Sequence, residues 1–91
     1  MGNSFLKRLA EFFTVLRLQP AFVIRIDREA AFLDGGQVDP VFLRGCSEIA
    51  ALYQLQGGLV LGLSRPGRIQ LQFREIPEGC QQNFRNLWAS L

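Results

Sequence analysis

The chain has 91 residues, of which 48% are hydrophobic and 20% charged, and its formal net charge is +2. This length predicts one small domain, and no apolar run reaches the roughly 18 residues of a membrane-spanning helix. Residues 21–91 hold seven arginines and seven acidic residues, so the body lacks the bulk positive charge of a general nucleic-acid binder. Histidine is absent, which removes the commonest general base and the commonest metal ligand.

Residues 3–18 have the apolar periodicity of an amphipathic helix. The large apolar side chains share one flank, within an arc of about 120°: Phe5, Leu6, Leu9, Phe12, Phe13 and Leu16. The charged side chains lie outside this arc, and their sum equals the net charge of the whole chain. Pro20 ends the helix, because the residue before a proline favours extended backbone. We therefore predict an amphipathic helix over residues 1–19 and a folded body over residues 20–91.

The body begins with two segments typical of strands. The first, "AFVIRID" (residues 21–27), alternates between an apolar face and a mixed face. The apolar face holds Phe22, Ile24 and Ile26, and the mixed face holds Val23, Arg25 and Asp27. A short second strand, "AFLD", ends at the glycines that follow it.

Asp39 followed by Pro40 predicts an N-cap and the first position of a helix. We expect this helix to run to about Gln56, where two glycines end it. Its apolar arc contains Phe42, Leu43, Cys46, Ile49, Ala50 and Tyr53. Gly45 is a poor helix former, and we expect it to let another element approach closely.

The second half repeats this order of elements. A strand over residues 58–64, a turn at Pro66-Gly67 and an alternating strand over residues 68–74 are predicted. In the last strand Ile69, Leu71 and Phe73 are expected to face the core. A final helix begins at Pro77, and its apolar arc contains Cys80, Phe84, Leu87, Trp88 and Leu91.

The predicted order after the first helix is ββαββα, which indicates an α+β fold. Each hairpin is antiparallel and both helices need an apolar surface, so we expect a four-stranded, largely antiparallel sheet with two helices on one face. The opposite face would then carry polar side chains: Arg25, Arg68, Gln70, Gln72 and Arg74.

The two cysteines, Cys46 and Cys80, are 34 positions apart and form neither a CxxC pair nor a zinc framework. Each lies in the apolar arc of a helix, where a free cysteine acts as a small hydrophobe. The glycines match neither a P-loop nor a dinucleotide fingerprint. We therefore predict no catalytic residues, no cofactor, no metal and no small-molecule substrate, and a protein that is not an enzyme.

Several motifs together resemble a family of short, uncharacterised bacterial proteins with an N-terminal hydrophobic segment. They are "AFVIRID", "FLRGCSEIA", the Gly57–Gly58 break, "GRIQLQF" and "IPEGCQQNFRNLW". The resemblance covers residues 21–89, and Cys46 matches the family pattern. It implies no catalytic role, because the family has no established activity. Members often have a continuous apolar span, whereas the charges of residues 3–18 each cost about 2.5–3.5 kcal/mol at a bilayer centre.

Two functions are compatible with these patterns. The favoured hypothesis is a non-catalytic interaction module that docks through the apolar flank of residues 3–18. Its partner would be another protein, a second copy or the membrane surface, which indicates a cytoplasmic protein or one peripheral to the inner membrane. The alternative is a small nucleic-acid-binding protein that contacts phosphates through arginines of the open sheet face: Arg25, Arg65, Arg68 and Arg74. That face offers no predicted aromatic side chain for base stacking, which makes the alternative weaker.

Overall fold

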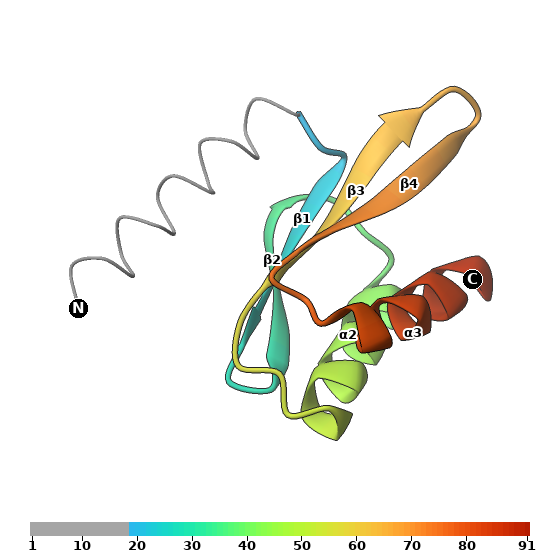
Figure 1. The fold of residues 1–91 in the computed structure, drawn as a ribbon. Helices are drawn as coiled ribbons and strands as arrows, with labels where there is room; N and C mark the ends of the chain where they lie inside the picture. Colours follow the sequence, from blue (N-terminus) through green and yellow to red (C-terminus); the bar gives the residue numbers. More distant parts are fainter. Residues whose placement is uncertain (1–18) are drawn as a thin grey trace.

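A computed structural model describes residues 19–91 of the chain, which form a sheet with two helices (Figure 1). In chain order the elements are β1 (Phe22–Asp27), β2 (Ala30–Gly36), α2 (Pro40–Leu52), β3 (Leu59–Arg65), β4 (Arg68–Arg74) and α3 (Glu78–Ala89). The predicted α+β order ββαββα is confirmed. The helix predicted over residues 3–18, together with its six apolar docking residues, lies outside the described residues.

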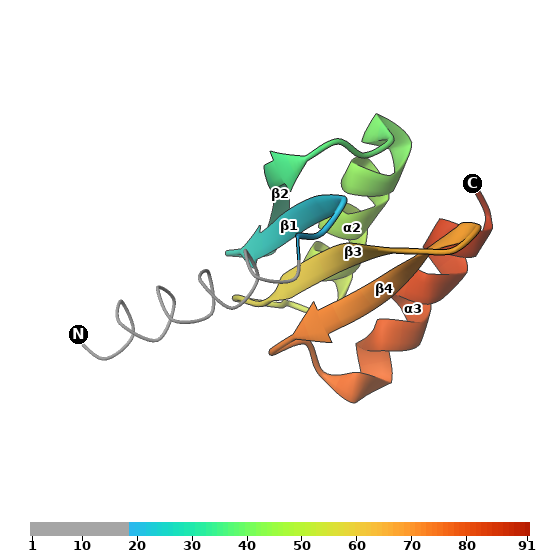
Figure 2. The same cartoon turned by 90° about the horizontal axis from the view of Figure 1, so that it is seen from above.

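The four strands form one antiparallel sheet in the order β2-β1-β3-β4. Each hairpin contributes one inner and one edge strand, and the inner strands β1 and β3 pair with each other. Both helices lie on the same side of this sheet, as Figure 2 shows. The predicted four-stranded sheet with two helices on one face is therefore confirmed, and the strand order is a new result.

The main core lies between the sheet and the two helices. Phe22 of β1, Phe42 of α2 and Phe84 of α3 are fully buried there. The ring of Trp88 lies 5.5 Å from that of Phe22 and 4.9 Å from that of Phe42. One aromatic cluster thus joins both helices to the centre of the sheet, and the predicted core role of Trp88 is confirmed.

The end of α2 differs from the prediction, because the helix stops at Leu52 and not near Gln56. Gln54 adopts a left-handed φ of 53°, and its amide donates to the carbonyl of Ala51 at 3.2 Å. The amide of Leu55 donates to the carbonyl of Ala50 at 2.9 Å, and the Leu55 side chain is buried. These bonds form a Schellman motif, in which a buried hydrophobic residue ends the helix before any glycine is reached.

The prediction that Tyr53 and Leu91 belong to the apolar arcs of their helices is wrong, because both side chains are exposed. Each lies just beyond the last residue of its helix, so helical spacing no longer directs its side chain inward. The Tyr53 hydroxyl instead accepts a hydrogen bond from the amide of Asn83 at 2.8 Å.

Glycines allow close approach at two places in the core. A Cβ at Gly45 would lie 2.4 Å from Leu87 of α3, which confirms the predicted close approach to α2. A Cβ at Gly62 of β3 would lie 2.1 Å from the ring of Phe22. Both distances are far below ordinary contact, so neither position has room for a side chain without movement of its neighbour.

We expect Gly62→Ala to lower the free energy of unfolding by about 1–3 kcal/mol, as overpacking of a dense core does. The ring of Phe22 cannot yield easily, because Phe42 and Trp88 already lie against it. The matched control is Gly57→Ala, since a Cβ there meets nothing within 4 Å. Urea unfolding curves of the two variants check this, and an equal loss of stability in both would contradict it.

Candidate interaction surface

The sheet face opposite the helices carries an apolar stripe along its two central strands. Strand alternation places Leu59, Leu61 and Leu63 of β3 on this face, and Val23 of β1 lies opposite Leu61 in the register. Leu61 and Leu63 form a buried cluster, against which Val23 and Leu59 are partly buried. We call these four residues the leucine stripe.

The leucine stripe is buried although no helix of the described chain covers it. Leu61 is 0% and Leu63 is 4% exposed, and neither belongs to the main core on the other side of the sheet. Within residues 19–91 both helices lie on the opposite face (Figure 2). A central strand that is apolar on both faces is typical of a sheet between two covering layers.

The stripe was not predicted from the sequence, because this face was expected to be mainly polar and the leucines of residues 59–63 were not assigned to it. The signal is present in "LVLGL" (residues 59–63), where both alternating sets are apolar. Val60 and Gly62 face the helices, and the three leucines face the other way. A strand of this composition is typical of a position that is buried on both sides.

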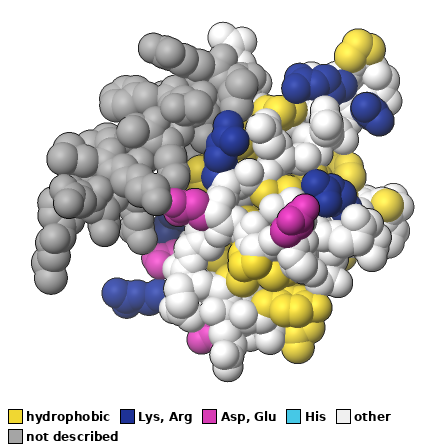
Figure 3. All heavy atoms as spheres, in the orientation of Figure 1, with side chains coloured by type: hydrophobic (Ala, Val, Ile, Leu, Met, Phe, Trp, Pro, Cys, Tyr) yellow, Lys and Arg dark blue, Asp and Glu magenta, His cyan; other side chains and the backbone are white. Residues whose placement is uncertain are grey.

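The predicted arginines form a rim around the stripe and do not converge on one point. Arg25 and Arg74 flank Leu59 on its two neighbouring strands. Arg65 and Arg68 are register partners at the hairpin end of β3 and β4. This end lies at the upper right in Figure 3, where basic side chains gather. The polar side chains that flank Leu61 and Leu63 on β4 are Gln72 and Gln70.

Arg25 is held by two carboxylates. Its Nε donates to Asp34 Oδ2 at 2.9 Å, and its Nη1 donates to Asp27 Oδ2 at 3.3 Å. Its guanidinium carbon also lies 4.8 Å from the centre of the Phe32 ring. The charge that the nucleic-acid hypothesis requires at this position is therefore already neutralised.

Arg65 also has a neighbour within the sheet, because its Nε donates to Gln70 Oε1 at 3.2 Å. The two ends of β4 place Arg68 and Arg74 about 20 Å apart, at roughly 3.4 Å per residue. No observation gathers the four arginines into one phosphate-binding site. The expectation that this face carries no aromatic side chain is wrong, because Phe32 of β2 lies exposed beside Arg25 on it. The nucleic-acid alternative stays a prediction.

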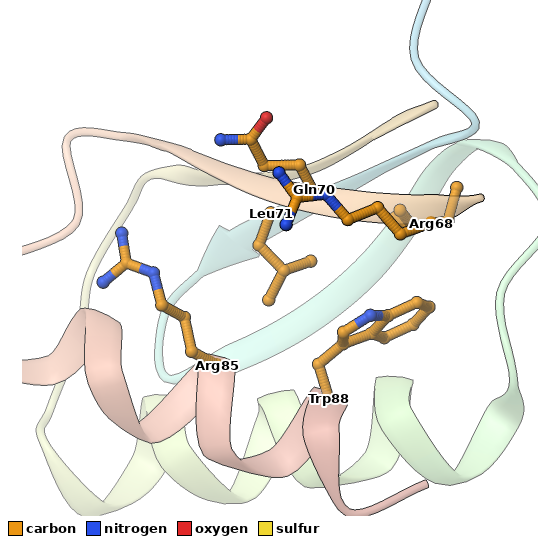
Figure 4. A pocket seen from close by; sticks show the side chains of 6 residues that line it. Arg68, Gln70, Leu71, Arg85 and Trp88 are labelled. Atoms are coloured by element: carbon orange, nitrogen blue, oxygen red, sulfur yellow. The ribbon is translucent and has the colours of Figure 1, made fainter. Parts of the chain in front are cut away.

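A cavity of about 260 Å³ lies between the edge strand β4 and helix α3. Figure 4 shows Leu71 of β4 and Trp88 of α3 on opposite sides of it, with the side chains of Arg68, Gln70 and Arg85 nearby. The guanidinium of Arg85 lies 5.0 Å from the Phe73 ring. The residues that line the cavity include no cysteine and no carboxylate, so they supply neither a nucleophile nor a general base.

Both cysteines are free and buried in the main core, which confirms the core position predicted for them. Burial raises the pKa of the Cys46 thiol from 9.0 to about 12, because the core cannot solvate a thiolate. A thiol of this kind is inert near neutral pH, since the thiolate is the nucleophile. Within residues 19–91, no three His, Cys, Asp or Glu side chains come together as a metal site would need.

The raised pKa of Cys46 predicts a loss of stability in alkali. From pH 9 to about pH 12 the folded state keeps the proton that the unfolded state loses. The stability that this group contributes is therefore complete below pH 9 and is lost as the pH rises towards 12. Its slope is at most about 1.4 kcal/mol per pH unit.

Urea unfolding between about pH 8 and pH 10.5 tests this for the wild-type chain and for Cys46→Ala. We expect the free energy of unfolding to fall less steeply with pH in the variant, although its value at pH 8 is lower because of the cavity left behind. All other groups are common to both proteins, so the difference in slope isolates the thiol. Equal slopes in the two proteins would contradict the protonated, buried state of Cys46.

Comparison of this chain with protein-family models, with curated proteins and with solved structures finds no match. The resemblance to the family of short bacterial proteins therefore stays a prediction. Within the described part of the chain, neither α2 nor α3 has the length and apolar character that crossing a bilayer requires.

Proposed function

We propose that this chain is a non-catalytic interaction module that binds an amphipathic helix on the open face of its sheet. The observation that carries the proposal is the burial of Leu61 and Leu63 on a face that lacks any described helix. Burial of apolar side chains is the main source of affinity for such a surface. The docking role predicted for residues 3–18 belongs to the same proposal, as the helix that this surface accepts.

The shape of the leucine stripe fits one helix. The stripe covers β1 and β3, whose axes lie about 4.8 Å apart, and a helix with its side chains is about 10–12 Å wide. Polar side chains border it along β4, where Gln70 and Gln72 lie, and at the far end of β1, where Arg25 and Asp27 lie. On the other side, β2 places Gly35 opposite Val23 and Phe32 opposite Arg25. An amphipathic helix would place its apolar flank on the leucines and its polar flanks over these borders.

The absence of histidine and the inert Cys46 thiol support a binding role in place of a catalytic one.

The test uses a fluorescein-labelled peptide with the sequence of residues 3–18. It is titrated into the full chain carrying Leu9→Glu and Phe12→Glu, so that the chain's own segment has lost its apolar flank. We expect saturable binding by fluorescence polarisation, and an affinity at least tenfold lower when Leu61→Gln and Leu63→Gln are added.

The matched control carries Leu52→Gln and Leu91→Gln, the same substitution at two exposed leucines away from the stripe. We expect this control to bind the peptide within twofold of its parent. If the Leu61 and Leu63 substitutions leave the affinity unchanged, the open face is not the binding surface and the proposal fails.

A further inference from the structure

Resting on the proposed function, we infer that the occupant of the leucine stripe is the chain's own segment, residues 3–18, docked within the same molecule. As the helix predicted from its sequence, the segment would present six large apolar side chains on one flank. The stripe is an apolar surface that the described residues do not cover with a helix. The chain therefore carries both halves of one interface.

The link between residues 3–18 and the sheet is short, and a backbone hydrogen bond holds its end beside the leucine stripe. The amide of Ala21 donates to the carbonyl of Gly62 at 2.7 Å, which extends the pairing of β1 with β3. Phe22 pairs with Gly62, so Ala21 lies beside the Leu63 end of the stripe. The segment thus joins the sheet next to its proposed binding surface.

The backbone also changes direction at this junction. Gln19 adopts a left-handed φ of 47°, a conformation typical of turns, and Pro20 follows it. A turn at this position lets the preceding segment run back along the sheet in place of continuing the line of β1. The observation gives the segment a route to the open face.

The segment is long enough to cover the leucine stripe. A helix of 16 residues is about 24 Å long, at about 1.5 Å per residue. Residues 59–63, which hold the three leucines of the stripe, span about 13 Å, at about 3.3 Å per residue. A helix over residues 3–18 would therefore cover the stripe from one end to the other.

The tether favours docking within one molecule over docking between two. Only residues 19–21 separate the segment from β1. A short tether of this kind gives an effective concentration on the order of millimolar, far above that of a free partner in solution. A second copy or a membrane would have to displace a segment that is always present at this concentration.

The first test compares peptide binding by three full-length proteins, with the labelled peptide of residues 3–18 as the probe. We expect the wild-type chain to bind it at least tenfold more weakly than the chain carrying Leu9→Glu and Phe12→Glu, because its own segment occupies the stripe. A control with Lys7→Gln and Arg17→Gln makes the same change of net charge outside the apolar flank and should bind as weakly as the wild type.

The outcomes separate this inference from the function on which it rests. Equal, strong binding of the peptide by wild type and by the Leu9→Glu, Phe12→Glu variant would show a free stripe, which overturns docking in the same molecule and leaves the helix-binding function intact. Binding by none of the proteins would overturn both.

Nuclear Overhauser contacts in the wild-type chain give a second measurement that needs no variant to fold. We expect contacts from the methyl groups of Leu61 and Leu63 to the rings of Phe5, Phe12 or Phe13, in a sample that light scattering shows to be monomeric. Contacts that appear only between differently labelled chains would assign the stripe to a second copy and overturn the inference, as would the absence of all such contacts.

Sedimentation with phosphatidylserine vesicles tests the membrane as the competing occupant of the segment. We expect the Leu61→Gln, Leu63→Gln variant to sediment with vesicles more than the wild type does, because the weakened stripe releases the apolar flank. If the wild-type chain sediments strongly and the substitutions make no difference, the flank faces lipid and docking in the same molecule is overturned.

Discussion

Phe42→Ala is expected to lower the free energy of unfolding by about 3–5 kcal/mol, the typical cost of removing a buried phenylalanine ring. Phe42 is 0% exposed, and its ring lies 6.0 Å from Phe22 and 4.9 Å from Trp88. The substitution therefore removes the contact that joins α2 to both the sheet and α3. Since small domains are stable by only about 5–15 kcal/mol, we expect the variant to be largely unfolded at modest urea concentrations.

Fluorescence of Trp88, the single tryptophan of the chain, follows this unfolding directly because its ring touches the substituted position. The control is Val41→Ala at the neighbouring position, which is 53% exposed and should change stability by no more than about 0.5 kcal/mol. A loss below about 1 kcal/mol for Phe42→Ala would contradict the aromatic cluster as the centre of the core.

Leu61→Ala is expected to lower the free energy of unfolding by about 2–5 kcal/mol, as in a well-packed core. A loss of this size requires another layer packed on the sheet face opposite the helices, because the same substitution on an uncovered sheet face removes few contacts. It is therefore a stability test of the leucine stripe that does not depend on knowing which side chains of residues 3–18 touch Leu61.

Leu52→Ala serves as the control for this prediction, since Leu52 is 74% exposed and has the same side chain to lose. Urea unfolding of both variants and the wild type gives the comparison. If the two substitutions cost equal amounts, the burial of Leu61 contributes nothing to stability, and the second core beneath the open face does not exist.

Most strands and helix starts of this fold could be predicted because local chemistry determines them. The second strand is an exception, because β2 was expected to end at the glycines and instead runs through Gly35 and Gly36, which pair with β1. Arg68–Arg74 alternates without a break after the Pro66-Gly67 turn, and β4 has the bounds predicted for it. Asp39 caps α2 as expected, since its Oδ1 accepts from the amide of Val41 at 2.8 Å. Such features need only neighbouring residues, so the sequence alone is sufficient to find them.

Features that depend on distant residues were not predicted. The end of α2 follows from the burial of Leu55, and Gln54 takes the left-handed position that sequence patterns assign to glycine. The neutralisation of Arg25 depends on Asp34, which the register of the β1–β2 hairpin and its irregularity after Val23 bring across from it. Neither effect has a signal within a window of a few residues.

The leucine stripe could be predicted from the sequence only in part. The two apolar sets of residues 59–63 signal burial on both faces of β3, but the signal identifies no partner for the second face. Pairing with β1 adds Val23 to the three leucines, and this pairing is a property of the strand order that the sequence left open. The surface emerges only once both central strands are in place.

The reactivity of a thiol introduced by Leu61→Cys tests most directly whether the open face is covered. The two native cysteines are buried, so they form a slow background in a native chain. We expect this thiol to react with a disulfide reagent at least about 100-fold more slowly than one introduced by Leu52→Cys, and adding Leu9→Glu and Phe12→Glu should accelerate the reaction at position 61 alone. Equal rates at positions 61 and 52 in the otherwise unchanged native chain would contradict the account.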